Sequence, residues 1–268
     1  GRSTGTGACW PIWSATTDDE LMRRTLEVME RRNVYGVVSG PLVDVWRRAA
    51  PDRLIPSLIL GLQDGGPPVD SVRAWVAAGR YAALGEVTIQ NEGREPADPA
   101  FAPYLALAAE LDIPVGIHIG TGPPGAPYLG FRNYRARLHS PLLLEDVLVR
   151  HPDLRIYIMH AGWPMLDELL ALMWTHPHVY VDVGIISFAL PRPAFHRYLH
   201  GIVEAGFGSR VLFGSGQMVW PDALEHAIEA IESAGFLTAD QKRAILYDNA
   251  ARFLRLTDAE IERHHGRR

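Results

Sequence analysis

The sequence has little cysteine, since Cys9 is the only one in 268 residues. One thiol cannot form a disulfide framework, and it cannot supply a zinc cluster that needs several thiolates. Any metal site in this chain must therefore be built from histidine, aspartate and glutamate side chains.

Long apolar runs are also missing, because no stretch approaches the roughly 18 residues that a membrane span requires. The first residues, from Gly1 to Trp10, form neither a signal peptide nor an amphipathic targeting segment. We therefore expect a cytoplasmic protein with no membrane partner. Gly1 stands where an initiator methionine would be expected, so the sequence can be a mature fragment or a truncated product.

An excess of basic residues is absent as well. The 26 lysines and arginines are outnumbered by 31 aspartates and glutamates, which gives a net charge of −5. A general nucleic-acid-binding protein would normally carry a basic face. The expected partner is a small-molecule substrate and not a nucleic acid.

What the sequence does contain is an alternation of short apolar segments with amphipathic helices. The apolar segments are rich in Val, Ile and Leu and alternate little, as in parallel strands that are covered on both faces. Their spacing is that of the βα units of a barrel or a doubly wound sheet. The predicted strands are 34–39, 54–60, 82–89, 113–119, 155–161, 179–184 and 210–213.

No linker, repeat or low-complexity segment divides the chain, so we expect a single domain over residues 1–268. Thr17 precedes Glu20 in a capping-box pattern ahead of an apolar helical repeat, which predicts the start of the first helix. Extra C-terminal helices are expected from about residue 238.

Seven strands are predicted, whereas a (β/α)8 barrel has eight. Residues 1–16 contain no credible strand, so the first strand of a barrel would lie upstream of Gly1 or be missing. The expected fold is α/β, a (β/α)8 TIM-barrel-like fold with seven visible strands. Such a barrel has two unpaired sheet edges, and we expect partial closure by another segment, a homodimer over the gap, or low stability.

Three side chains that can bind metal stand where apolar strands end: Glu86, His118 and His160. The carboxyl ends of parallel barrel strands meet at one mouth, where active sites form. One carboxylate and two imidazoles suit zinc or another divalent ion, which polarises a carbonyl and acidifies bound water. A lone histidine of this kind is more often a buried residue bonded to a backbone carbonyl, but three such side chains at equivalent positions favour a site.

Six short motifs from Thr17 onward occur in an order and spacing that are specific together. They are Leu84-Gly-Glu86, Gly116-Ile-His118, Met159-His160-Ala-Gly-Trp-Pro164, Val179-Tyr-Val-Asp182, Val211-Leu-Phe-Gly-Ser215 and Asn249-Ala-Ala-Arg-Phe253. With these motifs the chain resembles the amidohydrolase superfamily, in particular its amidohydrolase-related (type 2) branch. The resemblance implies a (β/α)8 barrel and metal-dependent hydrolysis of C–N or C–O bonds in small organic substrates.

The resemblance also implies roles for the three side chains. Glu86, His118 and His160 would bind one divalent ion, with zinc expected and manganese or iron as alternatives, and His160 would be catalytic. Some branches of the superfamily decarboxylate aromatic acids, so a decarboxylase is a second hypothesis. A third is a non-catalytic barrel that serves as a scaffold or a small-molecule binder.

Two departures from the family pattern limit the expected activity. The His-x-His of the family's first strand has no counterpart here, and the aspartate expected after Ser215 is Gly216, which can neither bind metal nor accept a proton. We therefore expect a single-metal site with impaired activity, and a Gly216→Asp substitution is expected to raise turnover. Asp182 has two interpretations, as a partner of a metal ligand or as a helix cap.

The long segment 120–140 follows the strand of His118 and is expected to be a loop over the mouth. Loops of this length in compact domains tend to be functional, and arginine can bind a carboxylate through two parallel hydrogen bonds. The alternative is a surface loop with solvated arginines. The predicted substrate-binding residues are Tyr128, Arg132, Arg137 and Trp163.

Two further patterns are interpreted as unrelated to function. The segment from Gly120 to Gly125 matches a dinucleotide-binding pattern, but prolines follow it in place of the helix that such a site needs. His176 and His178 precede a strand, which places them at the rim opposite the predicted metal site.

Overall fold

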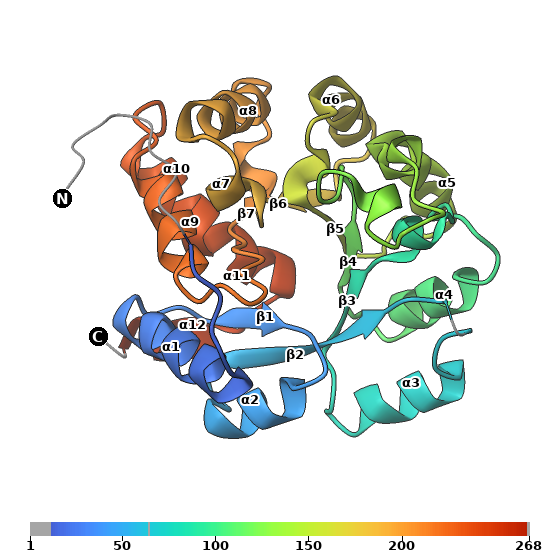
Figure 1. Cartoon of the computed structure of the whole chain (residues 1–268), viewed down its shortest axis with the longest axis horizontal. Coiled ribbons are helices and arrows are strands. Elements are labelled where there is room, and N and C mark those ends of the chain that lie inside the picture. Colours follow the sequence, from blue (N-terminus) through green and yellow to red (C-terminus); the bar gives the residue numbers. More distant parts are fainter. Residues whose placement is uncertain (1–11, 64, 267–268) are drawn as a thin grey trace.

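Seven parallel strands form one curled sheet in which the strand order follows the sequence (Figure 1). The computed structural model describes residues 12–63 and 65–266. Helices cover the outer face of the sheet, so the fold is the predicted TIM-barrel-like α/β arrangement with one side open. The strands are β1 (Gly36–Val38), β2 (Leu54–Leu60), β3 (Ala83–Val87), β4 (Val115–His118), β5 (Ile156–Met159), β6 (Tyr180–Asp182) and β7 (Val211–Leu212).

The helices fall into three groups. The α-helices beside the sheet are α1 (Asp18–Arg31), α2 (Val43–Ala49), α3 (Val69–Ala77), α4 (Ala102–Glu110), α5 (Glu145–Arg150), α6 (Leu166–Thr175), α7 (Ile186–Ala189), α8 (Arg192–Glu204) and α9 (Ala223–Glu232). The short 3-10 helices are η1 (Ile89–Glu92), η2 (Ala126–Tyr128), η3 (Ala136–His139), η4 (Pro141–Leu144), η5 (His160–Gly162) and η6 (Gly208–Arg210). The C-terminal group is α10 (Ala239–Arg243), the π-helix η7 (Ala244–Asp248), α11 (Asn249–Leu254) and α12 (Asp258–Gly266).

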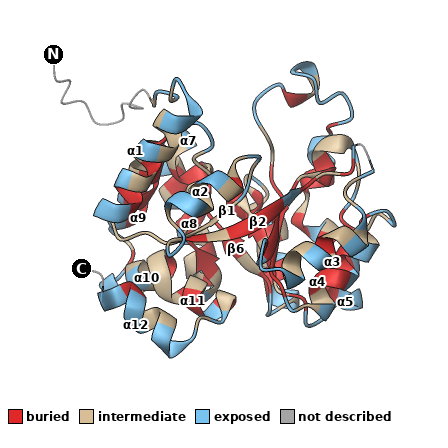
Figure 2. Cartoon of the chain, turned by 90° about the horizontal axis from the view of Figure 1, so that it is seen from below, coloured by how far each residue is buried: buried red, intermediate tan, exposed pale blue. Residues whose placement is uncertain are grey.

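The hydrophobic core lies between the strands and the surrounding helices. Figure 2 shows buried residues concentrated on the strands and on the helix faces that meet them. Ile117 and Ile158 on neighbouring strands are fully buried, as expected for a parallel sheet that helices cover. This burial explains why the strands are apolar without a regular alternation, which is the pattern that predicted all seven of them.

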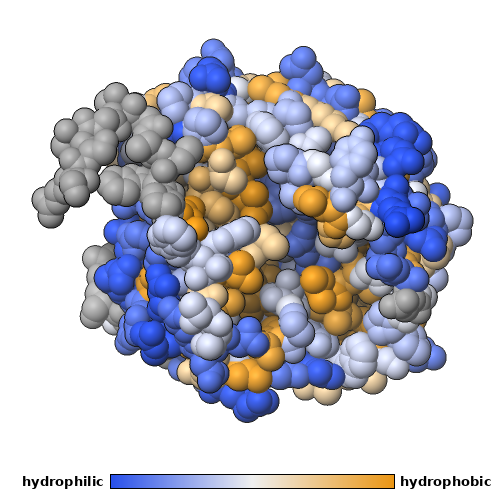
Figure 3. Space-filling view, viewed as in Figure 1, coloured by the Kyte–Doolittle hydropathy of each residue, from blue (hydrophilic) through white to orange (hydrophobic). Residues whose placement is uncertain are grey.

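At β2 the concave face of the sheet is open to solvent. In β2 the side chains of Leu58 and Leu60 are buried in the core, while Ile59 between them is 48% exposed. Successive strand residues point to opposite faces, so Ile59 points to the concave side. Figure 3 shows the same view as Figure 1, with apolar residues around a central hollow.

The start of the first helix and the start of the C-terminal helices were both predicted, the first with a capping box that forms only in part. Thr17 caps α1 by accepting a hydrogen bond from the backbone N–H of Glu20 at 3.1 Å, but the Glu20 side chain bonds to Thr16 and not to Thr17. The expected C-terminal helices begin at Thr238, which forms a complete capping box with Gln241.

Helix α1 packs on α9 beside the open side of the sheet. Its residues Val28 and Met29 form a second buried cluster with Leu224 and Ile228 of α9, and Leu54 joins them from β2. Val38 of β1 and Phe213 after β7 pack against the same cluster. This cluster is the partial closure by another segment that the unpaired edges predicted. Dimerisation over the gap stays a prediction.

Polar contacts join α1 to the segment that follows β7. Arg24 Nη2 lies 2.8 and 2.7 Å from the two carboxylate oxygens of Asp222, and Gln217 Nε2 donates to Thr25 Oγ1 at 2.6 Å. The backbone N–H of Phe213 donates to the carbonyl of Ile245 in η7 at 2.9 Å. One backbone hydrogen bond thus joins the residue that follows β7 to the C-terminal helices.

No helix within the described ranges is long and apolar enough to cross a membrane. Residues 1–11, with Cys9 and most of the segment predicted to contain no strand, lie outside the described residues. The part of that segment that is described, from Ile12 to Thr16, contains no strand.

Candidate metal centre

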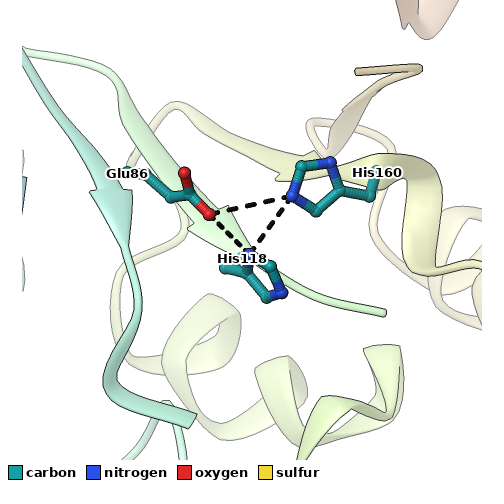
Figure 4. Close-up of side chains that lie close together, drawn as sticks. All are labelled: Glu86, His118 and His160. Carbon is teal, nitrogen blue, oxygen red and sulfur yellow. Dashed lines mark hydrogen bonds and ion pairs between the residues drawn. The ribbon is translucent and has the colours of Figure 1, made fainter. Parts of the chain in front are cut away.

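Glu86, His118 and His160 converge at the carboxyl ends of three neighbouring strands (Figure 4). His118 Nδ1 lies 2.5 Å from Glu86 Oε1 and 3.2 Å from His160 Nε2. His160 Nε2 lies 3.7 Å from Glu86 Oε1, and the three donor atoms lie within 4.8 Å of one another. The structure thus brings together all three residues that the sequence predicted as metal ligands.

Strand register explains the convergence. His118 is opposite Met159 in the β4–β5 pairing, so His160 follows directly beside it. On the other side, the β3–β4 register shifts between Leu84 and Val87. Irregularities of this kind re-aim side chains, and the shift places Glu86 beside His118.

The ring of His160 is oriented by its second nitrogen. His160 Nδ1 lies 2.9 Å from the carbonyl oxygen of Gly184. A carbonyl oxygen only accepts hydrogen bonds, so Nδ1 carries a proton; Nε2 carries a second proton when the ring is charged and a lone pair when it is neutral. Nε2 faces Glu86 and His118.

Asp182 supports His160 through the backbone. Its Oδ1 accepts hydrogen bonds from the backbone N–H of His160 at 3.0 Å and of Gly184 at 2.8 Å. The N-cap of the following helix α7 is Ile185. Asp182 is therefore a partner of a predicted ligand, and the helix-cap interpretation is wrong.

Burial and contacts with charged or hydrogen-bonding neighbours shift the pKa values of the candidate ligands in opposite directions. Burial raises the pKa of Glu86, but hydrogen bonds from His118 and His160 outweigh it, and the net pKa lies below the ordinary value. Burial lowers the pKa of His118. Burial also disfavours charge on His160, yet its contacts with Glu86 and Asp182 raise its net pKa. An anionic carboxylate beside a largely neutral His118 is a donor set that a divalent cation can use.

His139 is a fourth histidine beside the site, and the sequence did not point to it. Its ring is fully buried, stands edge to face with His118 at a centroid distance of 5.5 Å and stacks on Tyr134 at 4.5 Å. Burial, followed by the charges of His118 and His160, lowers its pKa to about 3. His139 ends the long loop, and the only signal in the sequence was its place within that loop.

Tyr157 lies on the strand before His160 and was also not predicted as part of the site. A Cβ atom added to Gly116 would lie 2.4 Å from the Tyr157 hydroxyl oxygen, so the phenol leans across the glycine of the neighbouring strand. Burial, helped by the charges of Asp182 and Glu86, raises its pKa. The phenol therefore stays protonated at neutral pH.

Gly216 has a backbone conformation that the sequence did not reveal. Its φ is +57°, and an added Cβ would lie 3.0 Å from Ile185 Cγ1 and 3.1 Å from the Ile185 backbone nitrogen. An aspartate here would adopt the left-handed region and displace Ile185. The expectation that Gly216→Asp raises turnover is therefore replaced by an expected loss of stability.

The four predicted substrate-binding residues occupy two different environments. Trp163 is half-buried beside the site, and its backbone N–H donates to the His160 carbonyl at 3.1 Å. Tyr128 is 91% exposed, and both Arg132 and Arg137 are exposed on the outer part of the loop. Their role in binding substrate stays a prediction.

The loop is anchored at both ends. The backbone N–H of Gly120 donates to the His139 carbonyl at 3.2 Å, and that of Thr121 donates to the Trp163 carbonyl at 2.9 Å. Between the loop and the segment after η1 lies a cavity of about 620 Å³, with Arg137 in its lining. None of the three candidate ligands lines this cavity.

The histidine pair before β6 is remote from the candidate ligands, as predicted. His176 Nε2 lies 3.7 Å from Glu145 Oε1 of α5, and His178 is exposed. Among the described residues, neither belongs to a group that could hold a metal ion.

One family model matches most of the chain. The sequence profile of the family described as Amidohydrolase matches residues 42–256. The protein fluG of Emericella nidulans is 22% identical over 168 residues, which are 57% of this chain and 18% of that protein. The chain thus spans about a fifth of this curated relative.

Two solved structures share the fold at low sequence identity. One is a probable 2-pyrone-4,6-dicarboxylic acid hydrolase from Acinetobacter baumannii with citric acid bound, with a TM-score of 0.67, 14% identity and 94% coverage of each chain. The other is a 5-carboxyvanillate decarboxylase from Novosphingobium aromaticivorans with manganese and 4-hydroxy-3-methoxy-5-nitrobenzoic acid. It has a TM-score of 0.59 and 16% identity, over 90% of this chain and 74% of that one.

Proposed function

Because the chain belongs to the amidohydrolase family, we propose that it is a metal-dependent hydrolase that cleaves a C–N or C–O bond of a small organic substrate. The observation that carries this proposal is the convergence of one carboxylate and two imidazoles within 4.8 Å. These groups come from three separate strands, and the strand ends of such barrels are where catalytic residues gather.

The donor set fits one divalent ion. Glu86 would supply a carboxylate oxygen, His118 its Nδ1 and His160 its Nε2, which is a combination that catalytic zinc sites use. Zinc is the ion we propose, with manganese or iron as alternatives, and the manganese in a structurally similar decarboxylase supports a divalent metal. When bound, such an ion supplies Lewis acidity and lowers the pKa of water.

The chain's own residues have three tasks in this proposal. Gly184 and Asp182 hold the ring and the backbone of His160, so its Nε2 is oriented before substrate arrives. His160 is the proposed catalytic residue. Trp163 lies beside it and would contact the substrate.

The long loop would bind the remaining part of the substrate. Tyr128, Arg132 and Arg137 are exposed in the structure, so they would contact substrate only if the loop bends towards the mouth. The carboxylic acids named for both structural neighbours support an acidic substrate, which guanidinium groups bind through paired hydrogen bonds.

Slow turnover is part of the proposal. Gly216 offers no proton acceptor, and Asp182 Oδ1 already accepts two backbone hydrogen bonds. Decarboxylation of an aromatic acid is the second candidate, because it does not require a base that activates water. The fold similarity to a 5-carboxyvanillate decarboxylase favours this alternative.

Metal analysis together with two activity assays tests these proposals. Wild-type protein purified from metal-replete medium should contain one equivalent of zinc, manganese or iron per chain. Glu86→Gln should lose it, while Glu262→Gln, which changes an exposed carboxylate on α12, should retain it. Folded wild-type protein without stoichiometric metal would support the non-catalytic alternative.

The activity assays separate the two reactions. Hydrolysis is measured on a panel of amides and lactones that carry carboxylates, and decarboxylation as CO₂ release from hydroxybenzoic acids. CO₂ release without hydrolysis in the metal-loaded protein would overturn the hydrolase proposal in favour of a decarboxylase.

A further inference from the structure

His139 is held against His118 by contacts at both its backbone and its ring. Its carbonyl accepts from the Gly120 N–H at 3.2 Å, and its ring stacks on Tyr134. Tyr134 is itself anchored, because its hydroxyl accepts from the Gly122 N–H at 2.6 Å. The imidazole of His139 is therefore placed before any ligand binds.

The two nitrogens of His118 have different surroundings. Nδ1 faces Glu86 Oε1 at 2.5 Å and can donate its proton to that carboxylate. Nε2 is buried and makes no hydrogen bond with any described residue. In the absence of a metal ion, the tautomer with its proton on Nδ1 satisfies that nitrogen and leaves Nε2 as an acceptor without a partner among the described residues.

Metal binding would change this tautomer. A metal ion takes the lone pair of the nitrogen it binds, so a neutral imidazole bound through Nδ1 must carry its proton on Nε2. Ligating histidines almost always donate this second N–H to an acceptor. For His118 that acceptor must lie next to the buried Nε2.

We propose that His139 is the positioning residue of His118 and accepts the hydrogen bond of its Nε2 proton when a divalent ion occupies Nδ1. The inference rests on the proposed metal centre. Both ring nitrogens of His139 are buried without a hydrogen bond of normal geometry to described residues, and a neutral imidazole offers one acceptor. The two rings stand edge to face, with 78° between their planes and 5.5 Å between their centroids, so this acceptor belongs to a ring that contacts His118.

This role links the loop to the metal centre. His139 belongs to the segment that follows β4 and not to a strand, so the arrangement of the loop helps to determine the tautomer of a ligand. Loss of such a partner typically weakens metal affinity by about 10- to 100-fold.

Zinc affinity of three histidine variants and of wild type tests the proposal, measured on the whole chain by competition with a chromophoric chelator. His139→Phe keeps an aromatic ring against Tyr134 but removes the acceptor, and it should weaken zinc binding by about 10- to 100-fold. His139→Gln restores an acceptor oxygen and should recover most of the affinity. His196→Phe removes a half-buried imidazole that bonds to the Ala230 carbonyl away from the site, and it should bind zinc as wild type does.

A spectroscopic measurement separates positioning from a merely structural role. In zinc-loaded wild type, ¹⁵N–¹H NMR of the imidazoles should show His118 with its proton on Nε2 and protected from exchange with water. In His139→Phe that protection should be lost, while the unfolding temperature of the metal-free variant stays close to that of metal-free wild type.

The outcomes distinguish the two proposals. If wild type and Glu86→Gln fail to differ in zinc affinity, the metal centre is wrong and the role of His139 falls with it. If wild type binds zinc through Glu86 but His139→Phe binds it equally well, only the role of His139 is overturned. Equal weakening by Phe and Gln would also overturn it, because the acceptor would then be irrelevant.

Discussion

The Nδ1 atom of His160 lies 2.9 Å from the carbonyl oxygen of Gly184. The same oxygen accepts from the backbone N–H of Ile186 at 2.7 Å, across a turn in which Ile185 has a φ of +62°. Positive φ is strained for a β-branched residue and persists where the surrounding structure imposes it. Here the strained turn presents the carbonyl that determines which nitrogen of His160 faces the site.

Asp182 provides a direct test of how this arrangement is held. Asp182→Asn retains Oδ1 and should preserve both backbone hydrogen bonds, whereas Asp182→Ala leaves two buried N–H groups without an acceptor. Each unsatisfied group costs about 1–3 kcal/mol, so the alanine variant should unfold at clearly lower urea concentration. Zinc affinity measured in parallel should fall for alanine and not for asparagine, and equal behaviour of the two variants would contradict the role of Oδ1.

Gly216→Asp should reduce stability and should not increase turnover. The substitution combines a left-handed backbone conformation with a Cβ contact of 3.1 Å to the Ile185 backbone nitrogen. Gly79→Asp is a matched control, because Gly79 has a φ of +68° and no heavy atom near its added Cβ. Thermal unfolding should show a larger loss at position 216 than at position 79. A gain in metal-dependent activity would show that the turn around Ile185 can relax.

His139 should make stability depend on pH. Its folded pKa of about 3 lies below the ordinary histidine value near 6.5, so the unfolded chain binds more protons between these two values. Stability from this group is therefore complete above pH 6.5 and is lost as the pH falls below it. Metal-free wild type should lose about 1 kcal/mol more than His139→Phe between pH 7.5 and 5.5. Urea unfolding at the two pH values measures this difference, and parallel slopes would mean that His139 is protonated in the folded state.

The closure of the open side should depend mainly on apolar packing. Ile228 is 5% exposed in the cluster between α1 and α9, so Ile228→Ala should cost about 2–5 kcal/mol. The Arg24–Asp222 pair is partly exposed, with 28% and 46% of the side chains accessible, and Arg24→Ala should cost about 0.2–1 kcal/mol. Urea unfolding of the Ile228→Ala and Arg24→Ala variants measures which substitution lowers the free energy of unfolding more. A larger cost for Arg24→Ala would indicate that the ion pair determines the closure.

The strands and the three candidate ligands could be predicted because their signals are local. A run such as Val115 to Ile119 is apolar because helices cover the sheet, and parallel strands place their carboxyl ends together. His118 and His160 were therefore expected to meet although 42 residues separate them. The resemblance to a known family rested on the same segments, and the profile match over residues 42–256 confirmed it.

Other features depend on contacts that no short pattern records. His139 lies beside His118 because the long loop returns to the mouth and its two ends are hydrogen-bonded. The cost of an aspartate at position 216 depends on the positive φ and on the nearby Ile185. Asp182 was left between two interpretations because one of its partners is the backbone N–H of His160 directly after the neighbouring strand, which no local pattern records.

The sequence by itself determined the order of the strands, the position of the metal-competent side chains at their ends and the absence of thiolate ligands, because these follow from residue type and local periodicity. Only the tertiary structure decided which nitrogen of each histidine faces the site, how the open edge is covered and which residue lies behind His118. These depend on distances between segments far apart in the chain, which packing and strand register set.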